Sequence, residues 1–201
     1  MYRVIAPEQM GHGRTGDAMD REFHYHDMAE DTVELMSQLK IESAVVVGVS
    51  DGGILGFDMA IHHPPRVTKL ALIGANYRID GYDEKGLEWL LNTKPDDWPK
   101  GLRERYERLS PDGASHWPVV FERLRRMWAV EPDYTREQMA SIKAPTLVIV
   151  GDKDLVRSEH AVEMFRAIPG AQLCVLPHTV HGRMPMETIL SFLTEPATSA
   201  H

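Results

Sequence analysis

The sequence predicts an α/β protein built around a mostly parallel sheet. Three observations predict it: short apolar runs of strand length recur along the chain, helical patterns separate them, and one run ends in a tight glycine-serine turn that leads into a helix. The runs cover residues 2–6, 44–48, 70–74, 146–150 and 172–176. We therefore expect about five strands flanked by helices.

Helical patterns follow the strand runs in order. After the first run, Asp27 and Glu30 have the spacing of a capping box, ahead of an apolar face that continues to Leu39. After the fourth run, Ser158 can cap a helix. The chain closes with a short apolar helix around residues 189–193.

The interval 77–143 breaks this alternation. It shows helical patterns punctuated by prolines and no convincing strand, and it carries all four tryptophans of the chain. We therefore predict an α/β core formed by residues 1–76 and 144–201 and a helical cap formed by residues 77–143. Most of the rings are expected to pack the insertion itself, with Trp128 and Met127 as candidates for the wall of a substrate pocket.

Composition narrows the class of partner. The chain has 201 residues, enough for one substantial core, and its formal net charge of −8 argues against binding to nucleic acid or to an anionic membrane. Its one cysteine, Cys174, lies in a strand run and excludes an internal disulfide. The sequence shows neither a membrane-span pattern nor a signal-peptide pattern, so the expected location is cytoplasmic and the expected partner is a small molecule.

The turn after the second run, Gly48-Val49-Ser50-Asp51-Gly52, carries the first sign of chemistry. A strand, a sharp turn and a helix place the Ser50 hydroxyl at the end of the sheet and near a helix N-terminus, which suits a nucleophile. Side chains at Gly48 and Gly52 are predicted to collide with the turn. The alternative is a glycine-rich turn whose serine only caps the helix.

Two later strand runs end in groups that could activate this serine. Run 146–150 leads into Asp152 and Asp154, and run 172–176 leads into His178 and His181. Because sites in parallel α/β sheets assemble at the carboxyl ends of strands, a serine, a carboxylate and an imidazole are expected to meet there. The spacing alone leaves both aspartates and both histidines open.

The order serine, aspartate, histidine, together with the serine turn, resembles the α/β-hydrolase fold family, in the branch with a helical cap before the acid-bearing strand. The resemblance covers nearly the whole chain, including segments 2–7, 11–15, 48–53, 144–147, 151–154 and 177–181. It implies that Ser50 is the nucleophile, His181 the base, Asp154 the acid, and the backbone N–H of Asp51 one oxyanion donor. It also implies a structural role for Asp152, and Gly182 with the loop length favours His181 over His178.

The resemblance also implies an N-terminally shortened member, because the family has further strands before the equivalent of run 2–6, and one of them leads into the loop with the second oxyanion donor. We expect run 2–6 to move into the vacated place and pair with run 44–48. The backbone of Gly13 would then supply the second oxyanion N–H. We also expect a homodimer, in which a second copy of the chain covers the exposed strand edge.

These features predict a serine hydrolase, a carboxylesterase acting on small carboxylic esters without a cofactor. Lactonase, amidase, carbon–carbon hydrolase and perhydrolase activities use the same machinery. The hypothesis from a different class is a non-catalytic or weakly active protein that binds a small ligand under the cap.

A metal site is not expected. His24 and His26 alternate in the way that can chelate zinc, but no third ligand with suitable spacing is evident near them in the sequence.

Overall fold

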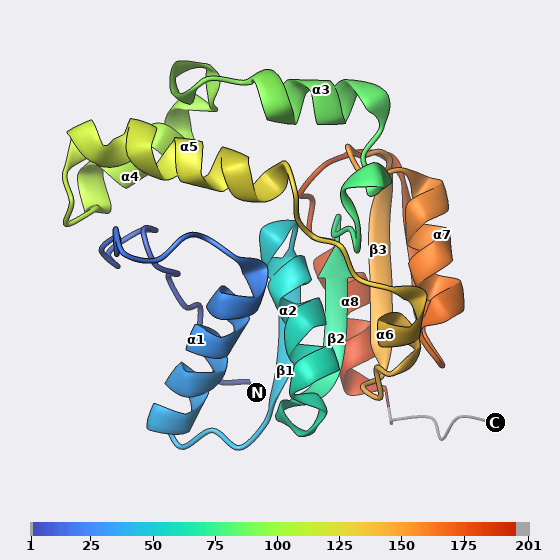
Figure 1. Ribbon diagram of the computed structural model, residues 1–201. Helices are drawn as coiled ribbons and strands as arrows, with labels where there is room; N and C mark the ends of the chain where they lie inside the picture. The colour runs from blue at the N-terminus through green and yellow to red at the C-terminus, as the bar shows by residue number, and fades with distance from the viewer. Residues whose placement is uncertain (1, 196–201) are drawn as a thin grey trace.

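The structure, a computed structural model, describes residues 2–195, so the last six residues of the predicted core lie outside the described part. Its sheet has four strands in the order β1-β2-β3-β4, and each neighbouring pair is parallel (Figure 1). The strands are β1 (Ala44–Val49), β2 (Val67–Ile73), β3 (Thr146–Lys153) and β4 (Gln172–Val180). The predicted α/β class with a parallel sheet is confirmed.

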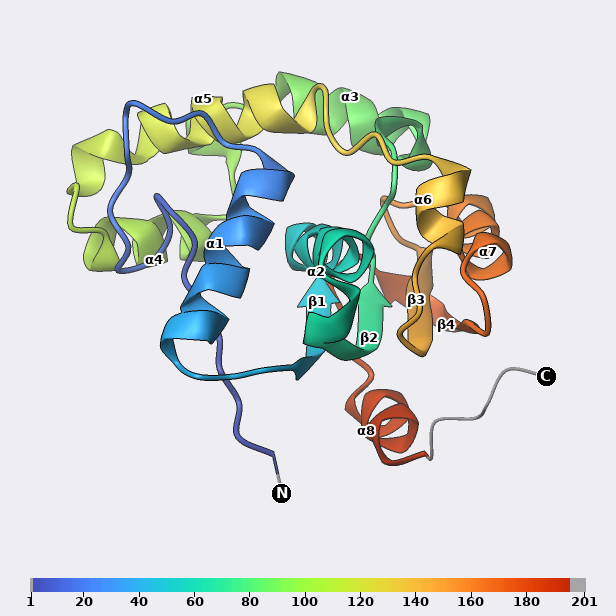
Figure 2. The same cartoon turned by 60° about the horizontal axis from the view of Figure 1, so that its bottom comes forward.

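Helices cover both faces of the sheet. Helix α2 (Asp51–His62) packs on β1 and β2, and α7 (Ser158–Ala167) packs on β3 and β4, while α1 (Tyr25–Gln38) packs against α2. Helix α8 (Met186–Thr194) covers the other face, as Figure 2 shows. The strands alternate between these layers: Leu70 and Leu72 belong to the larger core, and Ala71 and Ile73 to the core under α8.

The first strand run does not form a strand, so the expected fifth strand and its pairing with β1 are both wrong. Residues 2–6 are irregular and exposed, with Val4 84% accessible, and β1 pairs only with β2 within residues 2–195. A strand is held by a ladder of backbone hydrogen bonds, and its apolar pattern alone does not supply one. The homodimer stays a prediction, motivated by the free edge of β1.

Helix starts differ slightly from the predicted ones. Helix α1 begins at Tyr25 after His24, which makes no side-chain cap bond, so the capping box at Asp27 is wrong. Asp27 instead lies in the first turn of α1, where its negative charge interacts favourably with the positive end of the helix dipole. Helix α7 begins at Ser158, and the capping position is occupied by Arg157, which makes no side-chain cap bond. Ser158 is therefore the first helical residue and not the cap that the sequence predicts.

Residues 77–143 contain helices and short 3-10 turns and no strand. Helices α3 (Glu84–Asn92), α4 (Lys100–Leu109) and α5 (Trp117–Trp128) lie together across one end of the sheet (Figures 1 and 2). The chain then returns to β3 through α6 (Arg136–Ala140). Within this layer the Trp98 ring stacks on Trp89 and Trp128, with centroids 5.3 and 5.5 Å apart. The short 3-10 turns of the described chain are η1 (Pro64–Arg66), η2 (Ile79–Gly81), η3 (Pro95–Asp97) and η4 (Ala114–His116).

The N-terminal segment is attached to this helical layer through Asp17. The buried carboxylate of Asp17 accepts from His116 Nε2 at 2.8 Å and from the Arg123 guanidinium of α5. No helix within residues 2–195 is long and apolar enough to cross a membrane.

His160 is a buried histidine that makes stability depend on pH. It lies in α7 with its side chain fully buried, its ring stacks on Tyr77 at 4.1 Å, and its Nε2 accepts from the Tyr77 backbone N–H at 3.2 Å. Burial lowers the pKa of His160 to about 4. The unfolded chain, with an ordinary histidine pKa of about 6.5, therefore binds a proton that the folded protein does not bind between these two values.

We expect this histidine to contribute stability above about pH 6.5 that is lost as the pH falls toward 4. Urea unfolding should show that the wild type loses about 2 kcal/mol more than His160→Gln between about pH 7.5 and about pH 5. The difference between the two proteins is the measure, because the pKa of His24 is raised by its bond to Glu131 and acts in the opposite sense. Equal pH dependence in both proteins would contradict the assignment.

Candidate active site

Ser50 lies on a strained turn between β1 and α2. Its backbone has φ 53° and ψ −124°, a conformation that side chains rarely adopt, and its N–H donates to the Ile73 carbonyl at 2.8 Å. A Cβ at Gly48 would overlap the Gly52 carbonyl, and one at Gly53 would lie 2.7 Å from Ala75 Cβ. A Cβ at Gly52 would meet nothing within 4 Å, so the prediction that a Gly52 side chain collides with the turn is wrong. The turn needs glycine at 48 and 53.

This difference predicts opposite outcomes for two alanine substitutions. Gly48→Ala forces the backbone of the turn apart and is expected to cost about 3 kcal/mol or more in the free energy of unfolding. Gly52→Ala enters open space within α2, where alanine is the better helix former, and is expected to be neutral or stabilising by up to about 1 kcal/mol. Urea unfolding of the two variants measures both, and equal destabilisation would contradict this steric account.

The structure brings the serine, one histidine and one aspartate into a single hydrogen-bonded chain. His181 Nε2 lies 2.9 Å from Ser50 Oγ, and His181 Nδ1 lies 2.6 Å from Asp154 Oδ1. The Asp154 side chain is only 3% exposed, and its Oδ1 also accepts from the Val156 N–H at 3.1 Å. A carboxylate held in this way fixes the imidazole with Nδ1 protonated and Nε2 free to accept the serine proton.

The two rival residues lie apart from this chain of bonds. Asp152 Oδ1 accepts from the Thr179 backbone N–H at 3.0 Å, and backbone N–H groups of His178 and Thr179 lower the pKa of its carboxyl group. The Asp152 carboxylate therefore holds the backbone at the end of β4 in place. His178 is exposed and adopts φ 52° on the same strand.

The sheet explains why these distant residues meet. Ser50 follows β1, Asp154 follows β3 and His181 follows β4, and the carboxyl ends of parallel strands share one edge. Gly74 follows β2 at φ 58°, and a Cβ there would lie 3.1 Å from the His181 ring and 3.2 Å from Asp154. Sequence reasoning missed Gly74, although a glycine directly after a buried strand is a signal for close approach of another group.

Asp51 connects the serine turn to two other parts of the molecule. Its carboxylate accepts from the Tyr25 hydroxyl of α1 at 2.7 Å and from Trp128 Nε1 of α5 at 3.0 Å. Tyr25 is buried, and neither contact is visible in the sequence. These bonds fix the position of the residue that directly follows Ser50, at the N-terminus of α2.

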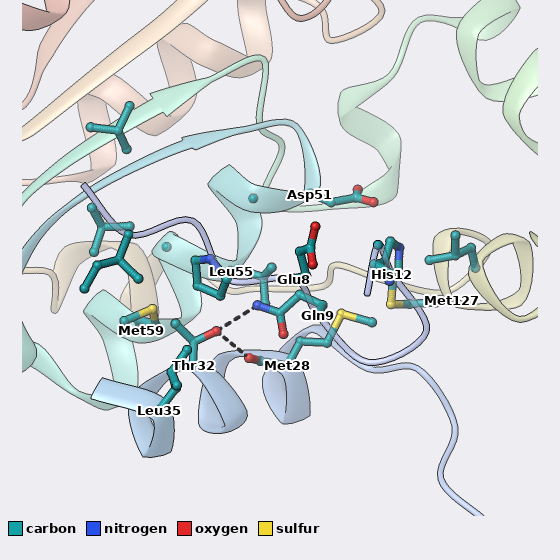
Figure 3. Close-up of a pocket in the computed structure, with 18 of the residues that line it drawn as sticks. Glu8, Gln9, His12, Met28, Thr32, Leu35, Asp51, Leu55, Met59 and Met127 are labelled. Atoms are coloured by element: carbon teal, nitrogen blue, oxygen red, sulfur yellow. Dashed lines mark hydrogen bonds between the residues drawn. The ribbon is translucent and has the colours of Figure 1, made fainter. Parts of the chain in front are cut away.

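A largely apolar cavity of about 610 Å³ opens beside Asp51. It lies between the free edge of β1, helices α1 and α2, the N-terminal loop and α5, and Figure 3 shows Met28, Leu55 and Met59 on its walls. Trp128 and Met127, the predicted pocket residues, both line it. Gln9 is fixed at its wall by a 2.8 Å hydrogen bond to Thr32 (Figure 3).

The predicted second oxyanion donor lies on the same cavity. Gly13 lines it together with Asp51, so the N-terminal loop and the serine turn face a common space. Gly13 has φ 60°, and the Glu8 side chain packs so closely against it that a Cβ would clash. Glu8 is in turn paired with Arg14 at 2.8 Å. The donor role of Gly13 stays a prediction.

Together, a parallel α/β sheet, a strained serine turn and a Ser-His-Asp hydrogen-bonded chain define an α/β-hydrolase architecture. A family model described as alpha/beta hydrolase fold matches residues 1–97. The solved meta-cleavage product hydrolase from Pseudomonas fluorescens IP01 superimposes with a TM-score of 0.74 at 25% identity, covering 96% of this chain and 77% of that one. The chain therefore has the α/β-hydrolase fold and is similar to proteins of that family in both sequence and structure.

Two curated relatives extend the comparison. A protein named putative carbamate hydrolase RutD, from Agrobacterium fabrum, is 26% identical over 198 residues, which cover 90% of this chain and 76% of the relative. The human protein named serine hydrolase BPHL is 28% identical over 199 residues, which cover 93% of this chain and 67% of the relative. This chain thus spans about three quarters and two thirds of their lengths.

Proposed function

We propose that the protein is a serine hydrolase that acts on small carboxylic esters. The observation that carries this proposal is the chain of short contacts from Ser50 Oγ through His181 to the buried Asp154. A serine hydroxyl is a weak nucleophile until a base takes its proton, and this arrangement provides the base and the group that orients it.

In the proposed reaction, Ser50 Oγ attacks the ester carbonyl while its proton passes to His181 Nε2. The imidazolium that forms is stabilised by Asp154 and returns the proton to the leaving alcohol, which gives an acyl-enzyme. Water then attacks the acyl group while His181 takes its proton, and His181 returns that proton to Ser50 Oγ as the bond to the acyl group breaks and the acid is released. The backbone N–H of Asp51, at the N-terminus of α2, would stabilise the negative charge on the carbonyl oxygen.

The volume and apolar lining of the cavity beside Asp51 support a small or medium-sized apolar acyl group. Aromatic and aliphatic side chains form most of its wall, among them Trp98, Trp128 and Met127. The names of the two relatives, putative carbamate hydrolase and serine hydrolase, also support hydrolysis as the reaction class. Lactones, carbamates and amides would use the same serine and histidine, and the fold itself does not choose among them.

Covalent labelling and a substrate panel test this proposal. A fluorophosphonate should modify the wild-type protein at one residue, which peptide mass spectrometry should identify as Ser50. p-Nitrophenyl esters of graded acyl length, compared with lactones, carbamates and anilides, should show the highest kcat/KM on a short-chain ester. Stable folded protein that is neither labelled nor active on any of these substrates would favour the non-catalytic ligand-binding alternative.

A further inference from the structure

A second cluster of reactive side chains lies outside the serine site, where α1 packs against α2. It contains His26 from α1 and Asp58 and His62 from α2, and one ligand atom from each lies within 4.8 Å of the others. His26 Nδ1 is 3.0 Å from Asp58 Oδ1, and His62 Nε2 is 3.9 Å from Asp58 Oδ2. From this geometry we infer a zinc-binding site formed by His26, Asp58 and His62, with a water molecule as the fourth ligand.

The distances suit a tetrahedral ion with small side-chain movements. Zinc bonds of about 2.0–2.1 Å place neighbouring ligand atoms about 3.4 Å apart. The 3.0 and 3.9 Å separations, which involve different oxygens of Asp58, lie on either side of this value, and all three ligand atoms lie within 4.8 Å of one another. Two imidazoles and one carboxylate are also a ligand set that zinc commonly accepts. Asp58 and His62 are four residues apart on one helix, which places their side chains on the same face.

Polar groups lie beside two of the three ligands. Asp58 is 1% exposed, and its Oδ2 accepts from the Tyr134 hydroxyl at 2.7 Å. The far nitrogen of His26, Nε2, lies 3.9 Å from Glu30 Oε1, and Glu30 also contacts His63 Nε2 at 2.5 Å. A metal at His26 Nδ1 would leave Nε2–H near the Glu30 carboxylate, and a small side-chain movement would bring the two into the hydrogen bond that orients histidine ligands in metal sites.

The charges of the cluster are compatible with a divalent cation. Asp58 offers a buried negative charge to two histidines at once, and Glu30 adds a second carboxylate beside His26 and His63. A buried carboxylate needs compensation, and one zinc ion bound to neutral imidazoles would provide it. The cluster is not visible in the sequence, since Asp58 and His62 come 32 and 36 residues after His26.

The site would act as a clamp between two helices. His26 directly follows Tyr25, whose hydroxyl binds Asp51 beside the nucleophile, and Asp58 is about two turns farther along α2 from Asp51. Zinc would therefore join the start of α1 to the helix that carries the serine turn. The proposed role is structural, and it does not depend on the ester-hydrolase proposal.

Zinc binding by metal-free, tag-free protein tests the site. We expect one equivalent in competition with a chromogenic chelator, an increase in Tm, and an intense visible absorption band when Co²⁺ replaces Zn²⁺. His26→Gln and His62→Gln should each weaken binding by at least about tenfold and remove the cobalt band. Tyr134→Phe should keep the stoichiometry but weaken binding by about tenfold.

His24→Gln is the matched control, because His24 belongs to the same alternating pair but contacts Glu131 and not the cluster. It should bind zinc as the wild type does. The His26 and His62 side chains are 54% and 32% exposed, so glutamine should be accommodated, and circular dichroism of the metal-free variants checks their fold. Absence of stoichiometric binding, or equal affinity in wild type, His26→Gln and His62→Gln, would overturn the inference and leave an ordinary histidine–aspartate pair.

Discussion

Replacing Ser50 with alanine is expected to lower kcat for ester hydrolysis by about 10⁵-fold or more and to abolish fluorophosphonate labelling. The substitution removes the one oxygen that His181 Nε2 contacts at 2.9 Å, so no acyl-enzyme can form. Alanine has a Cβ like serine, so the turn at φ 53° gains no atom and the fold is expected to persist. Stopped and continuous assays with a p-nitrophenyl ester measure the loss of kcat. Circular dichroism checks that the secondary structure of the variant matches that of the wild type.

Ser158→Ala is the matched control for this experiment. Ser158 also lies at the start of a helix, α7, but follows no strained turn and contacts neither His181 nor Asp154 in the described hydrogen bonds. Its activity and labelling should equal those of the wild type. Ester hydrolysis that survives in Ser50→Ala at a comparable rate would assign the chemistry to another group.

Sequence reasoning could locate the serine site because the site follows a simple rule of topology. Each candidate side chain follows an apolar run, and parallel strands end at one edge, so Ser50, Asp154 and His181 were expected to approach one another. Choosing between Asp152 and Asp154 needed the family resemblance, since both follow the same strand. The structure separates them by burial and by hydrogen-bond partner.

The first strand run and the histidine cluster show where sequence reasoning ends. Residues 2–6 have the apolar pattern of a strand, but a strand also needs a hydrogen-bonding neighbour, which no local pattern can guarantee. The contacts of His26 with Asp58, and of Asp51 with Tyr25, arise from the packing of α1 on α2. Such contacts depend on how two helices are rotated against each other, which their separate sequences do not specify.

The roles of the two neighbouring aspartates can be separated by matched substitutions to asparagine. Asp154→Asn is expected to lower kcat/KM by about 10⁴-fold, because an amide at the Oδ1 position no longer holds His181 with Nδ1 protonated and cannot stabilise the imidazolium. This loss corresponds to about 5 kcal/mol of transition-state stabilisation. Ser50 and His181 remain in place, so the protein should stay folded and react only slowly with a fluorophosphonate.

Asp152→Asn keeps an oxygen that can accept from the Thr179 N–H and changes no group that contacts His181. It is expected to retain kcat/KM within about tenfold, and any deficit should appear in the free energy of unfolding, since a charged acceptor of backbone bonds is replaced by a neutral one. Parallel measurement of kcat/KM and urea unfolding for both variants distinguishes a catalytic role from a role in stabilising the backbone at the end of β4. If Asp152→Asn lost more activity than Asp154→Asn, the acid would have to be reassigned to Asp152, and the 2.6 Å contact between His181 and Asp154 would not be the one that serves the reaction.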